Sequence, residues 1–477
     1  MRKLPFPLGN VHFIGIGGIG MSGIAEVLHG MGYSVQGSDI RKNANAERLE
    51  SLGVKIFVGQ KAENVANANL VVKSSAVKDD NAEIIAAKAN KIPIIRRADM
   101  LAEIMRLKWS IAIAGTHGKT TTTSLVAHIL STAEADPTII NGGIINAFGT
   151  NARLGSGDWM VVEADESDGT FTKLPATIGV VTNVDPEHLD HFGSFDNLKN
   201  AFITFIENLP FYGFGVMCWD HETVRKLLPE IIDKKVVTYG LTEGADLQAT
   251  ITKMEPDGLT FDVKITPRLA RDVTELKDVK LSMIGEHNVS NAMAAVAVAH
   301  QMGIKAEHIK QALRSFQGVK RRFTKVDEVN GIHIFDDYGH HPTEIEAVLC
   351  AASPVCQGRL IAVVQPHRFT RVRDLEAEFI QCFDKADQVF ITPVYTAGED
   401  PIDGVSSKIL AEKVVAQTGK PAIFVEDPKA LATALAPHVK SGDFVVCLGA
   451  GDITAHAHAL PDALREALSG DPVAVNG

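Results

Sequence analysis

The stretch AGTHGKTTTT, Ala114 to Thr123, decides the fold class of the central part of the sequence. It follows the apolar run Ile111–Ala114 and precedes the helical pattern TTTTSLVAHIL, so the sequence predicts a strand, a glycine loop and a helix in direct succession. The usual nucleoside-triphosphate loop reads G-x-x-x-x-G-K-[ST], yet Ile113 stands where its first glycine belongs, and the nearest earlier glycine, Gly115, lies only three residues before Gly118. The stretch therefore predicts a phosphate loop of a shorter kind.

Two side chains at the end of this loop have the chemistry that a magnesium–nucleotide site needs. We expect the Lys119 ammonium to contact the β- and γ-phosphates of a nucleotide and the Thr120 hydroxyl to bind Mg²⁺. Further ligands should follow neighbouring strands, because the carboxyl ends of parallel strands meet at one edge of a sheet. The segments VVEADES and VTNVDPEHLD end two predicted strands with the candidate ligands Glu163, Asp165, Glu166, Asp185, Glu187 and His188.

A second glycine loop, HFIGIGGIGMSG, lies about a hundred residues earlier in the chain. Gly15, Gly17 and Gly20 form G-x-G-x-x-G directly after an apolar strand pattern, and Asp39 ends the next predicted strand. This spacing is typical of a pyrophosphate site at the start of a helix, where backbone N–H groups face the phosphates. The pattern fits NAD, FAD and a nucleotide-diphosphate sugar equally well.

Short runs rich in Val and Ile alternate with helical patterns along almost the whole chain, which is typical of βαβ units and mainly parallel sheets. A length of 477 residues suggests about three domains. We expect them over residues 1–108, 109–322 and 323–477. Within the second, Pro256-Asp257-Gly258 separates two alternating runs and predicts a β-hairpin. The expected fold class is therefore α/β with three domains.

The composition excludes several classes of protein. The net charge is −11 and the densest cationic segment is the short run Lys320-Arg321-Arg322, so nucleic acid is not expected as a partner. Five cysteines without a C-x-x-C pair argue against a disulfide framework and a cysteine-rich zinc site. The start of the chain has no apolar stretch of signal-peptide length, and no run of about 18 apolar residues predicts a membrane span. We expect a cytoplasmic protein.

Six motifs follow one another along the three predicted domains: AGTHGKTTTTS, EADESDGTF, TNVDPEHLDHFG, GEHNVSNAMAA, DDYGHHPTEI and QPHRFTRVRDL. Together they resemble the Mur ligases, the ATP-dependent amino-acid ligases of peptidoglycan synthesis. The resemblance extends from Phe13 to Ile453 and accounts for the short loop, because this family uses G-T-x-G-K-[ST]. With GIGGIGMSGIAE near the start, the sequence is most similar to the members that use UDP-N-acetylmuramate and L-alanine.

The resemblance implies a separate role for each domain. A Rossmann-like N-terminal domain would hold the diphosphate of UDP-N-acetylmuramate. A P-loop-type central ATPase domain with a mainly parallel sheet would hold ATP with Mg²⁺ (or Mn²⁺), and a Rossmann-like C-terminal domain would bind L-alanine. The ATP that is consumed would phosphorylate the muramoyl carboxylate, and the alanine amine would then displace phosphate. We expect a monomer or a weak homodimer.

The family's motifs also assign expected roles to single residues of this sequence. The UDP-sugar positions are Gly15, Gly17, Gly18, Gly20, Asp39 and Ser74. The ATP positions are Gly115, Thr116, His117, Gly118, Lys119, Thr120, Thr121, Asn288 and Asn291, and the metal positions are Thr120, Glu163 and His188. The positions beside the substrate carboxylates are Tyr338, His340, Arg368 and Arg371. The catalytic positions are Lys119, Glu163, His188, His340 and Arg368.

Other functions stay open at this point. A related recycling ligase joins UDP-N-acetylmuramate to an intact tripeptide and shares the same motifs. From other classes, the chain could be an NAD-dependent dehydrogenase fused to a phosphate-loop module, with Asp39 on a ribose, or a nucleotide switch without catalysis. The dehydrogenase would change nicotinamide absorbance on turnover. The switch would bind nucleotide without releasing phosphate in response to an amino acid.

Overall fold

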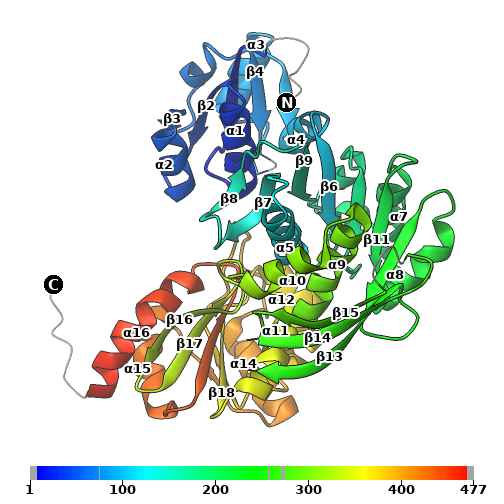
Figure 1. Ribbon diagram of the computed structural model, residues 1–477. Coiled ribbons are helices and arrows are strands. Elements are labelled where there is room, and N and C mark those ends of the chain that lie inside the picture. Colours follow the sequence, from blue (N-terminus) through cyan, green and yellow to red (C-terminus); the bar gives the residue numbers. More distant parts are fainter. Residues whose placement is uncertain (1–7, 75, 256–257, 270–273, 470–477) are drawn as a thin grey trace. The chain divides into compact units, whose positions relative to one another are not determined.

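The computed structural model describes residues 8–74, 76–255, 258–269 and 274–469. These residues form three β-sheets with helices between the strands (Figure 1). Residues 1–7, where the sequence predicts no signal peptide, lie outside the described part. In the described part, no helix is both long and apolar enough to cross a membrane. The five cysteines are free thiols, which agrees with the predicted lack of a disulfide framework.

The N-terminal sheet is parallel throughout, with strand order β3-β2-β1-β4-β5. Its elements are β1 Asn10–Ile14, α1 Ile19–Gly30, β2 Ser34–Asp39, α2 Ala44–Ser51, β3 Lys55–Val58, η1 Ala62–Val65, β4 Leu70–Lys73, α3 Ala82–Ala89, β5 Ile94–Arg96 and α4 Arg97–Met105. The strand order reverses direction between β1 and β4. In an open parallel sheet, ligands bind at the carboxyl ends of the strands at such a switch point. The loop between β1 and α1 lies there.

The central sheet has ten strands among the described residues, in the order β15-β14-β13-β12-β11-β10-β6-β9-β7-β8. Its elements are β6 Trp109–Ala114, α5 Lys119–Thr132, β7 Thr138–Ile145, β8 Thr150–Arg153, β9 Trp159–Glu163, η2 Thr170–Lys173, β10 Ile178–Val181, α6 Leu189–Phe192, α7 Phe195–Glu207, β11 Phe214–Cys218, α8 Glu222–Leu227, η3 Leu228–Glu230, β12 Val236–Gly240, β13 Leu247–Glu255, β14 Gly258–Ile265, β15 Glu275–Leu281, α9 Glu286–Met302 and α10 Ala306–Ser315. The strands from β13 through β12, β11, β10, β6 and β9 to β7 pair in parallel. β8 and β15 are antiparallel to their neighbours.

The C-terminal sheet has the order β16-β17-β21-β18-β19-β20, and its pairs are parallel except for β16 with β17. Its elements are β16 Thr324–Val329, β17 Ile332–Asp337, α11 Pro342–Ala352, η4 Ser353–Val355, β18 Leu360–Val364, α12 Phe369–Asp374, α13 Glu376–Gln381, β19 Gln388–Ile391, α14 Ser407–Thr418, β20 Ala422–Phe424, η5 Pro428–Ala430, α15 Leu431–Leu435, η6 Ala436–His438, β21 Phe444–Leu448 and α16 Ile453–Ser469.

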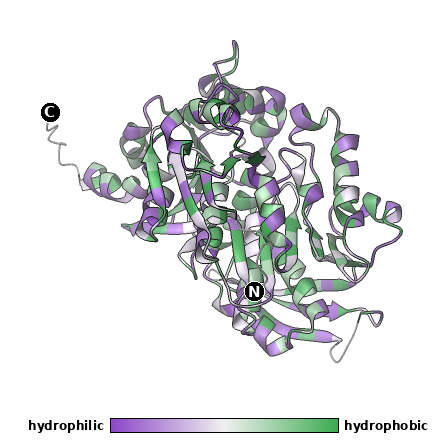
Figure 2. Ribbon diagram, turned by 90° about the horizontal axis from the view of Figure 1, so that it is seen from above, coloured by the Kyte–Doolittle hydropathy of each residue, from purple (hydrophilic) through white to green (hydrophobic). Residues whose placement is uncertain are grey.

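Both faces of the C-terminal sheet are covered by apolar cores. Along β18, Leu360, Ala362 and Val364 belong to one core, whereas Ile361 and Val363 belong to the other. Successive side chains of a strand point to opposite faces, so a strand buried on both faces is apolar at every position. In Figure 2, green (hydrophobic) stretches run along strands in the interior, whereas the helices carry both green and purple residues.

The chain divides into two compact units. The first comprises residues 1–253, 259–282 and 288–319, and the second residues 254–258, 283–287 and 320–477. The first unit therefore holds two of the sheets, and the second holds the C-terminal sheet. The boundaries near residues 108 and 322 stay predictions.

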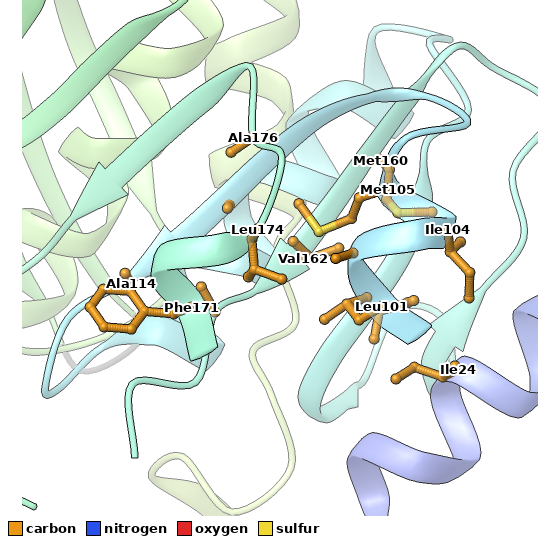
Figure 3. Packing of buried hydrophobic residues seen from close by; sticks show 14 of the residues in the cluster. Ile24, Leu101, Ile104, Met105, Ala114, Met160, Val162, Phe171, Leu174 and Ala176 are labelled. Carbon is orange, nitrogen blue, oxygen red and sulfur yellow. The ribbon is translucent and has the colours of Figure 1, made fainter. Parts of the chain in front are cut away.

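One apolar core joins the two sheets of the first unit. It extends from Val11 in β1 to Ile231 after η3 and includes one face of α4. Figure 3 shows Met105 of α4 beside Met160 and Val162, which lie on β9 of the central sheet, and Leu101 of the same helix on the side toward Ile24 of α1. The α4 helix thus fills space between elements that the sequence assigned to different domains.

The Val- and Ile-rich runs of the sequence predict strands at 11–16, 33–39, 70–76, 92–97, 110–115, 159–165, 177–184 and 214–219, which correspond to β1, β2, β4, β5, β6, β9, β10 and β11. The runs at 332–338, 360–366, 389–394, 422–427 and 444–451 predict the strands β17, β18, β19, β20 and β21. The strands of the predicted hairpin are β13 and β14, which neighbour each other in the sheet. Its turn residues Pro256 and Asp257 lie outside the described residues. The prediction missed β3, β7, β8, β12, β15 and β16.

Candidate active site

The loop after β6 is fixed to the end of the neighbouring strand β10. The His117 N–H donates to Asn183 Oδ1 at 2.7 Å, and Asn183 Nδ2 donates back to the His117 carbonyl at 3.0 Å. Thr182 Oγ1 donates to the same carbonyl at 2.6 Å. Thr116 Oγ1 accepts from the Asp185 N–H at 2.9 Å. The segment TNVD therefore holds the loop in place at the carboxyl end of the sheet.

Two glycines of this loop are required by close packing. Gly115 has φ 134°, and a Cβ there would lie 2.0 Å from Thr182 Oγ1. Gly118 has φ 81°, and a Cβ there would lie 2.4 Å from Asn291 Oδ1. Any other L-residue would meet both a strained backbone and a collision at these positions. Gly118 is also the N-cap of α5, and no side chain caps that helix. A helix N-terminus of this kind offers backbone N–H groups to an anion.

Lys119 lies in the first turn of α5 and is held by buried acceptors. Its Nζ is 2.9 Å from Glu166 Oε1, 2.5 Å from the Gly115 carbonyl and 3.0 Å from the Thr116 carbonyl. Burial disfavours the ammonium, but the negative charges led by Glu166 outweigh it and raise the pKa of Lys119. Burial raises the pKa of Glu166 in turn, with Lys119 opposing that rise. The pair keeps a cation at the start of a helix, where phosphate would bind.

Glu166, Glu187 and His188 form a group with metal-ligand geometry. One ligand atom from each lies within 4.8 Å of the other two. Glu166 is buried, and its Oε2 has no hydrogen-bond partner among the described residues. An unpartnered buried carboxylate oxygen fits a divalent cation, which prefers oxygen ligands. His188 has φ 57°, which places it in the left-handed region just before α6.

Glu163, which the sequence predicts as a metal ligand, is not a member of that group. It ends β9, and its Oε2 accepts from the Gly142 N–H at 2.9 Å. A Cβ on Gly142 would lie 2.4 Å from Glu163 Oε1, so the glycine permits this approach. The next glycine, Gly143, lies beside Thr120: a Cβ there would be 2.8 Å from Thr120 Cγ2. The role of Glu163 and Thr120 as metal ligands stays a prediction.

The Asp185 carboxylate contacts two histidines from different parts of the chain. His117 Nε2 lies 3.4 Å from Asp185 Oδ2, and His221 Nε2 lies 3.2 Å from Asp185 Oδ1. Burial opposes ionisation of this carboxyl, but hydrogen bonds from His117 and His221 hold its pKa well below the ordinary range. The sequence analysis missed His221, which is the N-cap of α8.

The predicted asparagines Asn288 and Asn291 lie in α9 against the first turns of α5. Thr122 Oγ1 donates to Asn291 Oδ1 at 3.2 Å, and Asn291 Nδ2 donates to Asn288 Oδ1 at 3.4 Å. Asn291 is 169 residues further along the chain than Thr122, so the fold brings the segment HNVSNA to the first turn of α5. The place of both asparagines at the adenine side of ATP stays a prediction. Thr121 is buried in the same turn of α5.

The first glycine loop, between β1 and α1, is tied to β2 and to the residues after it. The Gly17 N–H donates to Asp39 Oδ2 at 2.9 Å, and the side-chain amides of Asn43 and Asn45 donate to the Gly17 carbonyl. Gly18 is the N-cap of α1, again without a side-chain cap. The first glycine loop thus has the geometry of an anion site, while one oxygen of Asp39 is already bonded to it.

The other predicted residues of this loop lie close to it. A Cβ on Gly15, at φ 80°, would be 3.4 Å from the Ser74 Cβ. A Cβ on Gly20 would be 3.2 Å from Arg97 Nη1. Arg97 begins α4 and forms an ion pair with Asp165, at 3.0 Å between Nη2 and Oδ2. Arg97 therefore connects the first glycine loop with the EADES segment of the central sheet.

In the C-terminal sheet, the predicted residues Tyr338 and His340 lie in an aromatic cluster. Their ring centroids are 5.3 Å apart, and the His340 ring is 5.4 Å from that of His367. Tyr395 stacks on His367 at 5.5 Å. His341 plays a different part, because its Nδ1 accepts from the Thr343 N–H and caps α11. The two adjacent histidines therefore divide into one cluster member and one helix cap.

The predicted arginines adjoin this cluster. Arg371 Nη1 lies 3.3 Å from His367 Nδ1. Arg368 is exposed, has φ 70°, and its N–H donates to the Tyr395 carbonyl at 2.9 Å. Burial, with the neighbouring His340 and the two arginines, lowers the pKa of His367 to about 3. With His367 neutral, the positive charges of Arg368 and Arg371 remain beside it, and guanidinium groups pair well with a carboxylate.

The run Lys320-Arg321-Arg322 has a structural role in its own unit. Both Arg321 and Arg322 lie over the Tyr338 ring, 4.8 and 5.3 Å from its centroid. Arg321 Nη2 also donates to the carbonyls of Gly449 and Gly451. Arg321 thus fixes the GAGDI loop beside the aromatic cluster.

Three family models match consecutive parts of the chain. They are "Mur ligase family, catalytic domain" over residues 10–109, "Mur ligase middle domain" over 113–299 and "Mur ligase, glutamate ligase domain" over 321–451. The chain belongs to the Mur ligase family. The resemblance deduced from the six motifs is thereby confirmed, and the Mur ligase matches follow the same order as the three sheets.

Curated Mur ligases resemble the chain over nearly its full length. A UDP-N-acetylmuramate–L-alanine ligase of Brucella anthropi is 58% identical over 97% of this chain and 99% of its own. One from Parvibaculum lavamentivorans is 57% identical over 98% of this chain and 95% of its own. Among solved structures, UDP-N-acetylmuramate-alanine ligase MurC from Thermotoga maritima is 30% identical with a TM-score of 0.80, covering 95% of this chain and 98% of that one. These matches confirm the α/β Mur ligase fold.

A murein peptide ligase from Psychrobacter arcticus has the same fold, with a TM-score of 0.72, 24% identity, and 96% and 99% of the two chains covered. At that identity the likeness concerns the fold alone. The Mur ligase fold is therefore shared by proteins whose names denote different reactions.

Proposed function

We propose that the chain joins L-alanine to the muramoyl carboxylate of UDP-N-acetylmuramate, with hydrolysis of ATP to ADP and phosphate, in the synthesis of peptidoglycan precursors. The observation that carries this proposal is the 58% identity, over 97% of the chain, to a protein named for that reaction. The two glycine loops add support, because the reaction needs one site for the diphosphate of its substrate and another for ATP.

The chemistry explains why the reaction consumes ATP. A carboxylate is a poor acyl donor, since its leaving group would be oxide. A carboxylate oxygen of UDP-N-acetylmuramate therefore attacks the γ-phosphorus of ATP, and the bond from that phosphorus to the bridging oxygen breaks to release ADP. The alanine amine then attacks the carbon of the acyl phosphate. Loss of a proton from nitrogen and departure of phosphate leave the amide.

In the first step, the protein has to position the phosphates and balance their charge. Lys119, at the uncapped start of α5, is suited to contact the β- and γ-phosphates of ATP. The uncapped start of α5 also offers backbone N–H groups to the same phosphates. Asn288 and Asn291 are proposed for the adenine side, and no side chain has to act as a nucleophile.

Mg²⁺ fits the residues beside Lys119. Glu187 and His188, with the unpartnered Oε2 of Glu166, would hold one ion, and Thr120 and Glu163 are proposed as ligands close to the phosphates. A bound Mg²⁺ would supply positive charge to the transferring phosphoryl group. The buried Lys119–Glu166 pair keeps Glu166 oriented toward this place.

In the second step, a carboxylate-bearing amine must be oriented. The guanidinium groups of Arg368 and Arg371 beside the Tyr338–His340–His367 cluster are suited to pair with carboxylates. We include in the proposal a cytoplasmic location, where ATP is made, and a monomer or a weak homodimer. Light scattering coupled to size-exclusion chromatography would test the oligomeric state.

The function is tested by phosphate release from ATP and Mg²⁺, with UDP-N-acetylmuramate and single amino acids added in turn. We expect release that needs both the sugar nucleotide and L-alanine, and that EDTA abolishes. Glycine and serine are the informative competitors, because one methyl group gives only about 1–3 kcal/mol of discrimination. Release that needs neither added substrate would overturn the proposal. Release with the tripeptide L-alanyl-D-glutamyl-diaminopimelate but not with alanine would replace it by the recycling reaction.

A further inference from the structure

A buried polar cluster lies between the N-terminal sheet and the elements η1 and α3, and its members have no role among the residues assigned above. It contains His12 of β1, Gln36 and Ser38 of β2, Asn64 of η1 and Glu83 of α3. His12, Ser38 and Glu83 are 0% exposed, and Gln36 and Asn64 are each 6% exposed. A carboxylate in such a place is costly unless donors surround it, so its position calls for a reason.

Three donors from three elements converge on the Glu83 carboxylate. Ser38 Oγ donates to Oε2 at 2.6 Å, and Asn64 Nδ2 donates to Oε1 at 2.5 Å. His12 Nε2 lies 3.3 Å from Oε2, while Gln36 Nε2 lies 3.2 Å from His12 Nδ1. An N–H of Gln36 pointing at Nδ1 leaves the proton of His12 on Nε2, facing Glu83. Burial opposes ionisation, but these hydrogen bonds lower the pKa of Glu83.

Ser38 connects this carboxylate to the first glycine loop. Its carbonyl accepts from the N–H groups of Gly15 at 2.8 Å and Ile16 at 3.0 Å. The next residue, Asp39, accepts from the Gly17 N–H at 2.9 Å. Ser38 is therefore held by Glu83 through its side chain and holds the loop through its backbone. The end of β2 fixes three consecutive N–H groups of the loop.

We propose that Glu83 is a positioning residue for the sugar nucleotide: through Ser38 it sets the end of β2, and thereby the backbone of the glycine loop and the uncapped start of α1, which receive the diphosphate. This rests on the proposed function. The ionised carboxylate needs all its donors at fixed places, and a shift of Ser38 would carry Gly15 and Ile16 with it. An apolar core could stabilise the sheet as well, but it would not fix the position of the Ser38 backbone through directional hydrogen bonds.

The test compares two variants that each remove one hydrogen bond from the same carboxylate. Ser38→Ala removes the bond on the loop side. Asn64→Ala removes the bond on the far side, together with the bond from Asn64 Nδ2 to the Gly59 carbonyl. Calorimetric titration with UDP-N-acetylmuramate, without ATP, gives Kd, and steady-state kinetics gives KM for each substrate. We expect Ser38→Ala to raise the Kd and the KM for the sugar nucleotide about fivefold, the effect of one lost hydrogen bond. Its kcat and its KM for ATP should not change.

Asn64→Ala should lower the melting temperature like Ser38→Ala and leave Kd within twofold of the original protein. Glu83→Gln, which turns an amide donor toward the surrounding donors, should weaken binding more, and adding Ser38→Ala to it should change Kd little further. If Ser38→Ala binds as tightly as the original protein, or both alanine variants weaken binding equally, the inference is wrong. If the original protein does not bind UDP-N-acetylmuramate at all, the proposed function fails instead.

Discussion

Lys119 has two roles that substitution can separate. It neutralises the buried Glu166, 2.9 Å away, and it is proposed to contact the phosphates of ATP. Lys119→Ala should lower kcat by about a hundredfold to a thousandfold, the range found when one preorganised charge donor is removed. It should also lower the free energy of unfolding by about 3 kcal/mol, because it leaves a buried carboxylate unpaired. Steady-state phosphate release and urea unfolding measure the two effects.

The double variant Lys119→Ala with Glu166→Gln provides the matched comparison. It removes the unpaired charge, so most of the lost stability should return, while kcat should stay as low as in the single variant or fall further. Near-normal turnover in Lys119→Ala would remove the phosphate-loop assignment.

The partly buried His128 should make the free energy of unfolding depend on pH. Its ring packs against those of Phe316 and Phe148, with centroids 5.6 and 6.4 Å away, and burial lowers its pKa below the ordinary value of about 6.5. As the pH falls below that value, the unfolded chain takes up the proton first, so the free energy of unfolding decreases. The contribution is fully present above about pH 6.5 and is lost on acidification toward the lower folded pKa.

His128→Phe should therefore make the fall of the unfolding free energy between about pH 6.5 and pH 5 less steep. Urea unfolding at several pH values, followed by circular dichroism, measures the slope for both proteins. Parallel curves for the two proteins would contradict the burial argument.

Sequence reasoning names the candidate residues that belong to motifs and misses those whose contacts depend on packing. The predicted residues Lys119, Glu166, Glu187 and His188 follow strand ends, where sheet geometry brings them together. His221 is 36 residues from Asp185 and has no motif of its own, so only the packed structure shows the contact. The same holds for Tyr395, which reaches His367 by pairing between two loops.

At the scale of elements, the short loop between β6 and α5 depends on Gly118. Gly118→Ala would place a Cβ 2.4 Å from Asn291 Oδ1 at φ 81°. The collision should displace either α9 or the loop, so the affinity for an ATP analogue with Mg²⁺ should fall at least tenfold, beyond the cost of backbone strain alone. Calorimetric titration measures this loss.

Gly149 supplies the control for that substitution. It also has a positive φ, 66°, but a Cβ there meets nothing within 4 Å. Gly149→Ala should cost only the left-handed backbone strain of about 1 kcal/mol and leave nucleotide affinity unchanged. Equal loss of affinity in both variants would show that general destabilisation, not the contact with Asn291, is responsible.

Two physical reasons explain why sequence patterns missed β15, β16 and β7. β15, ELKDVKL, and β16, TKVDEV, are edge strands with charged side chains, which protect an open edge but hide the apolar signal. β7, TIINGGII, is interrupted by Gly142 and Gly143, whose spacing reads as a turn. Strands buried on both faces, such as β18, are apolar throughout and were predicted without difficulty.

At the scale of the whole molecule, the N-terminal and C-terminal sheets should differ in their ability to fold without the rest of the chain. The segment 320–477 contains a complete six-stranded sheet with a core on each face. Expressed alone, it should fold cooperatively, with a single thermal transition, and show no ligase activity. A fragment that lacks a cooperative transition would contradict this.

The fragment 1–108 gives the contrasting case. Without the central sheet, the face of α4 that carries Leu101, Ile104 and Met105 would lose its partners from β9 and η2. We expect this fragment to aggregate or to bind a hydrophobic dye, although its own sheet is complete. The same dye should bind the full chain only weakly.

The apolar core shared through α4 has a consequence for recombination between relatives. A chimera that takes its N-terminal sheet from one parent and its central sheet from another would have to match two halves of one core, including Met105 against Met160 and Val162. A crossover near residue 108 therefore cuts through a packed interior, although it falls between two family models. A crossover near residue 319 leaves that core, which extends from Val11 to Ile231, within a single parent.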